Sequence, residues 1–599
     1  MEKKSFKQLA KASMSLSSLI QRQKKKLPPT ASGMMMGFSN LETQEVVQKK
    51  DLLSLLVQSE EVKKLAKEFA DLSPEERIEP LSETILSARV TVETARLLVE
   101  SKNTERVNTK KEKQLHLDAA SLDVALTPAS GVGRAVIETG KKVLIGIVDS
   151  GFDLTHPMFR DAAGKLRVDG LLDQTGLVPK EFTTAQLETN WAAGTKSGGD
   201  DHGHGTHVAG IAGGTKFKGF EGMAPGARFL LVKTNFVDTA DGVKWAFTKA
   251  GTKPCVVNMS LGSHFGSHDG SSAEEILIDQ LSGPGKIVVI SAGNEREGRL
   301  HVGGRFLANE IQNLTFDVQR SRNPLQNAMG LLTLWYDPSD DFDVTLLTPS
   351  NQELPVPAVG TTDSFSTPSV DVEIGRSTYT PTNLIQIQIT LSFQSSSPAP
   401  ALLNDWGLRL NCRTATIGRI DGWFANTGFG RFDPHPFVEE TRTIGMPATA
   451  NACVAVASHV SKRDWKSDAG NQQDLGVVVG RSSPFSSQGP TRDGRLKPDI
   501  SAPGQFLTSA LGSGSDMENE VERVRKIERL LTIEGTSMSA PVVTGLIALL
   551  LQKKKTLTPD AIKAILKSSA RIDAHVGTAG WNPTYGNGKI DIKKAMSAV

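Results

Sequence analysis

A nearly continuous apolar run, Val143–Val148, places the strongest constraint on the fold of this chain. It is rich in β-branched residues, which is typical of a strand buried on both faces in a parallel sheet. Similar runs follow at Phe229–Val232, Cys255–Asn258 and Lys286–Ser291, separated by segments such as Gly242–Ala250 that suit helices. This alternation of strands and helices predicts an α/β fold with a parallel sheet.

A different pattern occupies residues 300–439. The segment Leu384–Leu391 alternates apolar and polar residues, which is typical of antiparallel strands with one wet face. A strand pair is predicted around the turn Asp337–Asp340, and two further strands at Leu408–Leu410 and Ile417–Phe424. Because the α/β pattern returns afterwards, we expect an antiparallel β-sandwich inserted into the parallel-sheet core.

The first 128 residues form a polar region rich in Lys, Glu, Ser and Gln. A helix is predicted over Glu60–Leu72, and a short strand and a helix around Ala88–Val92 and Thr94–Val99. Thr127–Gly131 has the composition of a linker. We therefore expect a separate N-terminal module of helical or mixed structure.

Charge and composition exclude several classes of function. The formal net charge is only +2, so no global field favours nucleic acid or an anionic membrane surface. The longest apolar helix candidate, Val542–Leu551, has about half the length of a membrane span. The N-terminus lacks the apolar stretch of a secretory signal, which favours a cytoplasmic location. Cys255, Cys412 and Cys453 are too few and too scattered for a disulfide framework.

Three separate segments supply the residue types of a hydrolytic Ser, His and Asp set. Asp149 stands at the carboxyl end of the first buried run, where open α/β sheets place their sites. His204 lies in the small-residue segment Asp200–Gly210, and Ser537 begins a buried apolar helix whose amino end favours an anion. A serine hydroxyl needs a base, and the base needs an orienting carboxylate. Each residue alone also suits a turn or a helix cap, so their joint occurrence carries the prediction.

These motifs resemble those of the subtilisin-like serine proteases, or subtilases, in which Asp, His and Ser occur in this order. The resemblance rests on Asp-Ser-Gly at 149–151, His-Gly-Thr-His-Val-Ala-Gly at 204–210, Ser-Ala-Gly-Asn at 291–294 and Gly-Thr-Ser-Met-Ser-Ala-Pro at 535–541. It implies the catalytic set Asp149, His204 and Ser537, with Asn294 and the Ser537 N–H as oxyanion donors. It also implies a substrate-binding role for Ser260, Leu261, Gly262 and Gly293.

The resemblance gives each segment an expected role. Residues 1–128 would be an extension and a propeptide, 129–299 and 440–599 the two parts of the catalytic core, and 300–439 a jelly-roll-like insertion. This layout is similar to that of clostridial spore-germination subtilases. The expected activity is endopeptidase hydrolysis of protein or peptide substrates through an acyl-enzyme, with self-processing of the N-terminal region. No cofactor is required by this reaction; calcium is common in the family, but no acidic loop here has convincing ligand spacing.

Three alternatives stay open on the sequence. His202, His204 and His207 near Asp200 and Asp201 could form a metal site, although the subtilase motif already accounts for His204. The chain could be an inactive scaffold whose β-sandwich is the working surface. It could also cut only its own N-terminal segment and then bind without further turnover. The insertion itself could brace the core or select the substrate.

Overall fold

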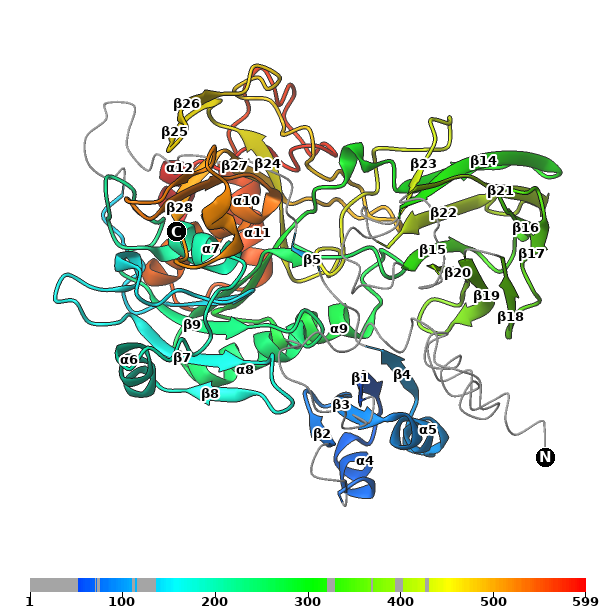
Figure 1. The fold of residues 1–599 in the computed structure, drawn as a ribbon, viewed down its shortest axis with the longest axis horizontal. Helices are drawn as coiled ribbons and strands as arrows, with labels where there is room; N and C mark the ends of the chain where they lie inside the picture. Colours follow the sequence, from blue (N-terminus) through cyan, green and yellow to red (C-terminus); the bar gives the residue numbers. More distant parts are fainter. Residues whose placement is uncertain are drawn as a thin grey trace.

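The computed structural model describes residues 52–70, 72, 76–109, 114–115, 136–319, 329–367, 370–393, 402–425 and 430–599. Three parts are distinct in Figure 1: an α/β core, a β-sandwich beside it and a small N-terminal module below. The sequence from Lys286 to the C-terminus passes from the core into the sandwich and back, so the sandwich is an insertion. The predicted α/β fold with an inserted antiparallel unit is confirmed.

The core is an eight-stranded sheet whose strands are parallel except for the edge strand β8. The strand order across it is β27 (Ile500–Gln505), β24 (Val454–Val460), β12 (Lys286–Ser291), β10 (Cys255–Met259), β6 (Leu144–Asp149), β9 (Arg228–Lys233), β7 (Val168–Asp173) and β8 (Lys180–Phe182). The four apolar runs singled out in the sequence are thus β6, β9, β10 and β12. Each lies in the middle of the sheet, where both faces are covered.

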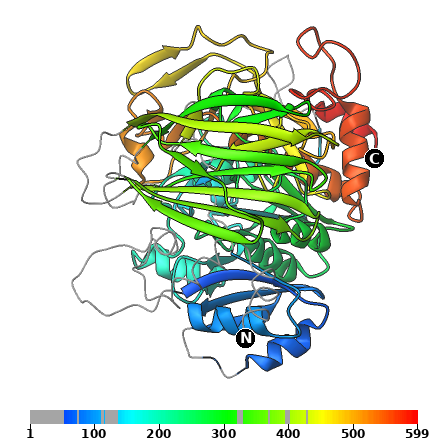
Figure 2. The same cartoon turned by 90° about the vertical axis from the view of Figure 1, so that its right-hand side faces the viewer.

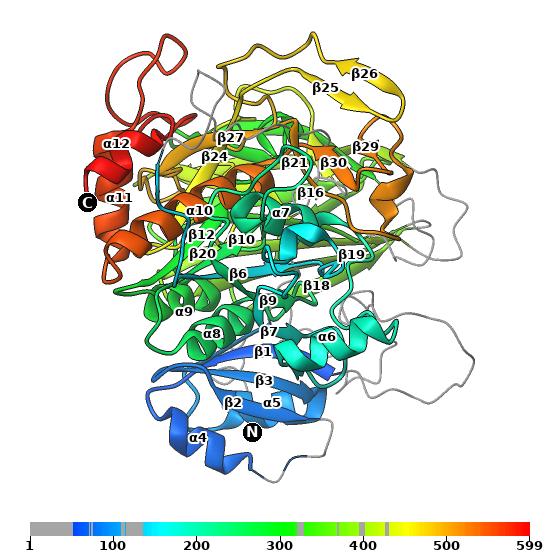
Figure 3. The same ribbon diagram turned by 90° about the vertical axis from the view of Figure 1, so that its left-hand side faces the viewer.

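Helices cover both faces of this sheet (Figure 3). Ile145 and Ile147 of β6 face one layer, whereas Leu144 and Val148 face the other, as the period of a strand requires. The first layer contains α7 (His204–Gly213), α10 (Thr536–Lys553), α11 (Pro559–Ser569) and α12 (Ile592–Ser597). The second contains α8 (Thr239–Ala250) and α9 (Ala273–Leu281), and α6 (Thr184–Ala192) lies against β7.

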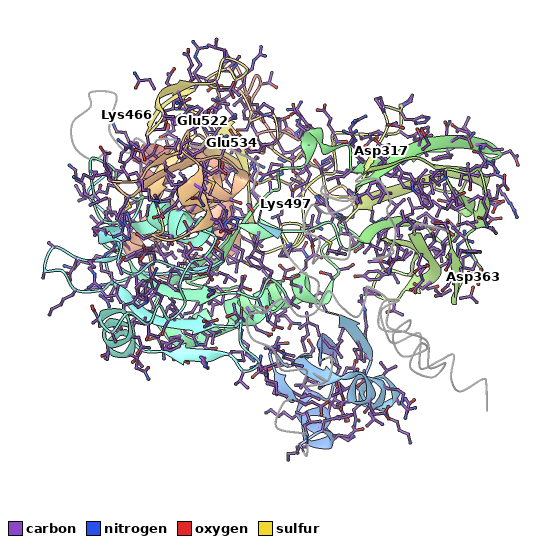
Figure 4. The ribbon with its side chains drawn as sticks, in the orientation of Figure 1. Asp317, Asp363, Lys466, Lys497, Glu522 and Glu534 are labelled. Carbon is purple, nitrogen blue, oxygen red and sulfur yellow. The ribbon has the colours of Figure 1, made fainter. Side chains whose placement is uncertain are left out.

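The insertion consists of two antiparallel sheets (Figure 2). They enclose one apolar core with three buried tryptophans, Trp335, Trp406 and Trp423. One sheet has the order β13 (His301–Arg305), β22 (Arg419–Phe424), β15 (Met329–Tyr336), β20 (Leu384–Phe393), β19 (Val370–Tyr379) and β18 (Thr361–Ser366). The other has the order β17 (Glu353–Pro355), β16 (Asp341–Leu347), β21 (Leu402–Thr414), β14 (Glu310–Gln319) and β23 (Gly430–Phe432). In Figure 4, Asp317 and Asp363 lie on the sandwich, and Lys466, Glu522 and Glu534 lie on the core.

One sequence prediction about the sandwich is wrong. The turn Asp337–Asp340 does not join a strand pair, because β15 before it and β16 after it belong to different sheets. The Asp340 carboxylate accepts the backbone N–H groups of Thr416, Ile417 and Gly418 at 2.7–2.9 Å. These bonds fasten the turn to a distant loop, so the chain crosses from one sheet to the other instead of folding back.

The N-terminal module is a four-stranded antiparallel sheet with two helices. The strand order is β2 (Arg77–Pro80), β3 (Ile85–Thr91), β1 (Leu52–Gln58) and β4 (Arg106–Thr109), with α4 (Val62–Glu68) and α5 (Val92–Glu100). The strand and helix expected near residues 88–99 are β3 and α5, whereas the helix expected over Glu60–Leu72 is the shorter α4. The apolar strand β1 was not predicted.

This module rests on the layer of α8 and α9. Leu56, Leu81 and Ile85 share an apolar cluster with Ala240 of α8 and Leu277 of α9. The buried Ser87 hydroxyl also donates to Asp241 at 3.1 Å. A separate short strand, β5 (Gln114–Leu115), pairs with β11 (Leu261–Gly262) of the core. The region that precedes the core therefore contacts it through both the module and β5.

Candidate active site

Asp149 ends β6 at the carboxyl edge of the parallel sheet. Its Oδ1 accepts a hydrogen bond from His204 Nδ1 at 2.7 Å, and both side chains are fully buried. Because a carboxylate only accepts, Nδ1 carries the hydrogen and Nε2 of the neutral ring is left as the basic atom. Within the described residues, Nε2 has no hydrogen-bond partner. The pair thus has the orientation that a general base requires.

His204 is the first residue of α7, and glycines bring this helix close to β6. Gly203 precedes it with φ of 102°, a conformation that favours glycine. A Cβ atom at Gly205 would lie 2.3 Å from the Gly151 carbonyl oxygen and 3.0 Å from Asp149 Cβ. Any larger residue at 205 would push the helix away, so the small residues seen in the sequence set the distance between His204 and Asp149.

A second buried carboxylate, Asp200, ties the two loops together. Its Oδ1 accepts from the Ser150 hydroxyl and the Gly203 N–H, both at 2.8 Å. Its Oδ2 accepts from the N–H and the hydroxyl of Thr206 at 2.8 and 2.6 Å. Burial raises the pKa of Asp200, while the bonds from Thr206, Gly203 and Ser150 oppose that rise. The sequence pattern predicted no role for Asp200 beyond the metal alternative. Its place four residues before His204 was the one available signal.

Asp200→Ala should lower the free energy of unfolding by about 2 kcal/mol, because it leaves two buried N–H groups and two hydroxyls without their acceptor. Asp200→Asn should fall between the wild type and Asp200→Ala, since one oxygen remains. Thermal unfolding in a Ser537→Ala background, which avoids self-cleavage, measures both. Equal melting temperatures for Asp200→Ala and its parent would show that this carboxylate does not hold the loops.

Ser537 is the second residue of α10, which packs against α7. Its hydroxyl donates to the Ser260 carbonyl at 3.2 Å, and the Ser260 hydroxyl donates in return to the Ser537 carbonyl at 2.7 Å. Asn258 Nδ2 donates to Ser260 Oγ at 2.9 Å, and Thr544 of α10 donates to Asn258 Oδ1 at 3.0 Å. The predicted nucleophile is therefore locked to the predicted substrate-binding segment.

Asn294 lies beside the amino end of α10. Its Oδ1 accepts from the Thr536 N–H at 2.9 Å and from the Thr536 hydroxyl at 3.0 Å. The Gly293 N–H donates to that hydroxyl at 3.1 Å. The Asn294 Nδ2 is buried and has no acceptor in the described part of the chain. The Asn294 Oδ1 is thus held in place, and the hydrogens on Nδ2 are available to donate to a developing oxyanion.

The described residues also bear on the metal alternative. His207 Nε2 lies 3.0 Å from the carbonyls of Leu507 and Leu531, so it donates a hydrogen and cannot bind a metal through that atom. Burial, with a smaller effect of His204, lowers the pKa of His207 to about 3 and that of His202 to about 4. No group of three His, Cys, Asp or Glu side chains placed to hold a metal was found among the described residues.

The predicted substrate-binding segment pairs with part of the N-terminal region. In the antiparallel pairing of β5 with β11, Leu115 lies opposite Leu261 and Gln114 opposite Gly262. Ser260, whose carbonyl accepts the Ser537 hydroxyl, directly precedes β11. An extended segment therefore lies on β11 next to the predicted nucleophile, as a peptide would. Nothing in the sequence of Gln114–Leu115 indicated this pairing.

A buried lysine pairs with a carboxylate elsewhere in the core. Lys497 Nζ donates to Asp499 Oδ2 at 2.7 Å and to the Cys453 carbonyl at 2.6 Å. Desolvation lowers the pKa of Lys497, but the nearby Asp499 and Cys453 oppose this and the net effect is a rise. The position of Lys497 is labelled in Figure 4. Asp499 is thus paired within the fold and has no place in the Asp149–His204 pair.

Comparison with known proteins adds to this geometry. The model of the Subtilase family matches residues 140–323 and 425–588. Serine protease AprX of Bacillus subtilis is 30% identical over 161 residues, which are 26% of this chain and 32% of AprX. C5a peptidase of Streptococcus pyogenes is 34% identical over 126 residues, 19% of this chain and 10% of the peptidase. The chain therefore spans about a third or less of these curated relatives.

One solved structure has a similar fold over most of the length of this chain. The CspB protease of Clostridium perfringens superposes with a TM-score of 0.62 at 24% sequence identity. The match covers 77% of this chain and 93% of CspB. At 24% sequence identity, this similarity is evidence for a shared fold alone. No helix in the described part of the chain is long and apolar enough to cross a membrane.

Proposed function

This chain belongs to the subtilase family of serine proteases, and we propose that it is an endopeptidase that uses Asp149, His204 and Ser537 as its catalytic triad. The observation that carries the proposal is the buried Asp149–His204 pair, whose Nε2 has no hydrogen-bond partner among the described residues. His204 lies on α7, which packs against α10, the helix that carries Ser537 as its second residue. Protein substrates follow from the family, which needs no organic cofactor.

The proposed reaction has two acyl-transfer steps. Nε2 of His204 takes the proton from Ser537 Oγ as this oxygen attacks the substrate carbonyl carbon. Asn294 Nδ2 and the Ser537 N–H donate to the carbonyl oxygen as it becomes negative. The protonated His204 then gives its proton to the leaving amine, and the C–N bond breaks. Water, deprotonated by His204, attacks the acyl-enzyme and releases the acid and Ser537.

We also propose that the first substrate is the chain's own N-terminal region. The pairing of Gln114–Leu115 with β11 supports this, because it brings that region to the segment beside Ser537. The segment that pairs with β5 directly follows Ser260, whose carbonyl accepts the Ser537 hydroxyl. The cut is therefore expected close to Leu115. The module at residues 52–109 would remain bound through its contact with α8 and α9 until it dissociates.

The test compares wild type with Ser537→Ala by intact mass and by labelling with a fluorophosphonate probe. The wild type should lose a fragment ending near Leu115 and, once the fragment has been removed, take up one label. Ser537→Ala should stay full-length and unlabelled, because the nucleophile is absent.

Two results would contradict this proposal in different ways. A correctly folded, cleared wild type without label would exclude an activated serine and favour the inactive scaffold. A Ser537→Ala chain that is shortened like the wild type would show that another protease makes the cut. Labelled wild type that hydrolyses no peptide in trans would instead favour a protease with a single, internal cut.

A further inference from the structure

A cluster of four stacked rings joins the α/β core to the β-sandwich; its members are His264, His268, His301 and Trp423. Trp423 of β22 stacks on His268 of the core, with centroids 4.1 Å apart, and on His301 of β13, at 4.7 Å. His268 also stacks on His264 at 5.0 Å. All four side chains are at most 2% exposed. Three buried histidines therefore meet at one junction, and the proposed mechanism uses none of them.

Hydrogen bonds fix this ring cluster to three segments of the chain. The His264 N–H donates to the Ala425 carbonyl of the insertion at 3.2 Å. His268 Nδ1 lies 2.9 Å from the Ile444 carbonyl, in the segment that returns from the sandwich to the core. The cluster thus links the loop after β11, the sandwich and the returning segment.

The three histidines differ in what would meet an additional ring N–H. His301 Nε2 lies 3.2 Å from the Asp421 carboxylate. His264 Nε2 lies 3.5 Å from the Glu295 carboxylate. His268 Nδ1 donates to a carbonyl, which only accepts, and its buried Nε2 has no hydrogen-bond partner in the described part of the chain. A proton on this Nε2 would create a buried cation whose new N–H lacks an acceptor, which is costly.

The charges near His268 offer a proton little compensation. The titratable and charged groups of the cluster and its immediate neighbours come from the loop after β11, the sandwich, the segment after β12 and the turn at 491–495: His264, Asp269, Glu295, His301, Arg419, Asp421 and Arg492. Arg492 pairs with Asp269, and its N–H donates to the His268 carbonyl at 3.1 Å. Burial, with smaller effects of His264, His301 and Arg492, holds the pKa of His268 well below its ordinary value, although the bond to Ile444 opposes this.

We propose that the ring cluster is an acid-sensitive junction, which holds the loop after β11 against the sandwich while His268 is neutral and releases it when His268 takes up a proton. In the opened state His268 should bind its proton with the ordinary pKa of about 6.5, whereas the closed junction binds it only at a much lower pH. The opened state therefore binds more protons. Closure is favoured above about pH 6.5 and is lost as the pH falls below that value. This junction does not depend on catalysis by Ser537.

The experiment measures amide hydrogen exchange by mass spectrometry on the full-length Ser537→Ala chain, from about pH 7.5 to about pH 5. Protection factors are compared, because they remove the direct effect of pH on the chemical exchange rate. In peptides that contain the His264 N–H, protection should fall about tenfold per pH unit below 6.5, as the uptake of one proton requires. Peptides from β6 are the internal reference for the core, whose own buried histidines also titrate.

His268→Asn, made in the same chain, is the test variant. The Asn amide can donate to the Ile444 carbonyl in place of Nδ1, and it takes up no proton. The φ of 53° at position 268 also suits Asn. The tenfold slope should disappear from its junction peptides, while β6 behaves as in the parent chain. His575→Asn, which changes an exposed histidine, is the matched control and should keep the slope of the parent.

Three results would overturn the inference. Junction protection in the parent chain that does not change between about pH 7.5 and 5 would exclude an acid-sensitive contact, even if His268→Asn does not fold. A folded His268→Asn chain with the slope of its parent would assign the proton to another group. Junction peptides with the same protection factors as β6 at every pH would show that the junction opens only when the whole chain unfolds.

Discussion

Replacing His204 with alanine is expected to lower kcat by about 10⁶-fold, the loss known for the equivalent change in subtilisin. Nε2 of His204 is the basic atom, because Nδ1 donates to Asp149 at 2.7 Å. Without the ring, Ser537 Oγ has no base to take its proton. Asp149→Ala should cost less, about 10⁴-fold, since it removes the group that orients the ring and leaves the base.

The prediction that His204→Ala loses more kcat than Asp149→Ala is the more specific test, because a general loss of folding would affect both variants alike. Burst titration and single-turnover kinetics on purified, N-terminally cleared protein provide the rates. These variants should not process themselves, so the N-terminal region must be cut by an added protease at an engineered site.

His202→Ala is the control for the loss of a neighbouring imidazole. The His202 ring lies 6.3 Å from that of His204 between centroids, and burial holds the pKa of His202 at about 4, so it is neutral in the working range. Its removal should change kcat less than tenfold. A His204→Ala enzyme that keeps more than about a hundredth of wild-type kcat would contradict the assignment of the base.

The predictable part of this fold is the part that local pattern determines. Strands buried on both faces must be apolar throughout, so β6, β9, β10 and β12 were visible as runs. The candidate site residues lie in short motifs at the ends of such elements: Asp149, His204, Asn294 and Ser537. Their sequence positions therefore indicated which edge of the sheet would carry the site.

The features that sequence pattern missed depend on contacts between distant segments. The pairing of β5 with β11 joins residues almost 150 positions apart, and neither segment has a strong strand pattern. The chain crosses between sheets at Asp340 because this carboxylate binds a loop near residue 417. The loop after β11 is held in part by the sandwich, through the bond from the His264 N–H to the Ala425 carbonyl. No periodicity reports such packing.

The insertion also contacts the core in a way that its place in the sequence could not reveal. Braces and selectors were both compatible with an inserted β-sandwich. The stack of His264, His268 and Trp423 joins the loop after β11 to the sandwich, which supports the role of a brace.

Asn294→Ala is expected to lower kcat by about 10²–10³-fold with little change in KM, as the loss of the equivalent donor does in subtilisin. The buried Asn294 Nδ2 has no acceptor among the residues that the structure describes, whereas Oδ1 is held by Thr536. In the proposed mechanism, this amide is therefore oriented in advance toward an oxygen that becomes negative only in the transition state. Such a donor stabilises the transition state more than the bound substrate, which is why kcat should fall and KM should not.

The same substitution also leaves the Thr536 N–H without its acceptor at the start of α10, so some loss of stability accompanies it. Titration of active sites separates the two effects, because unfolded protein reduces the number of sites and leaves kcat per site unchanged. A kcat per titrated site within threefold of wild type would show that Asn294 does not bind the oxyanion. A rise in KM with unchanged kcat would assign Asn294 to ground-state binding of the substrate instead.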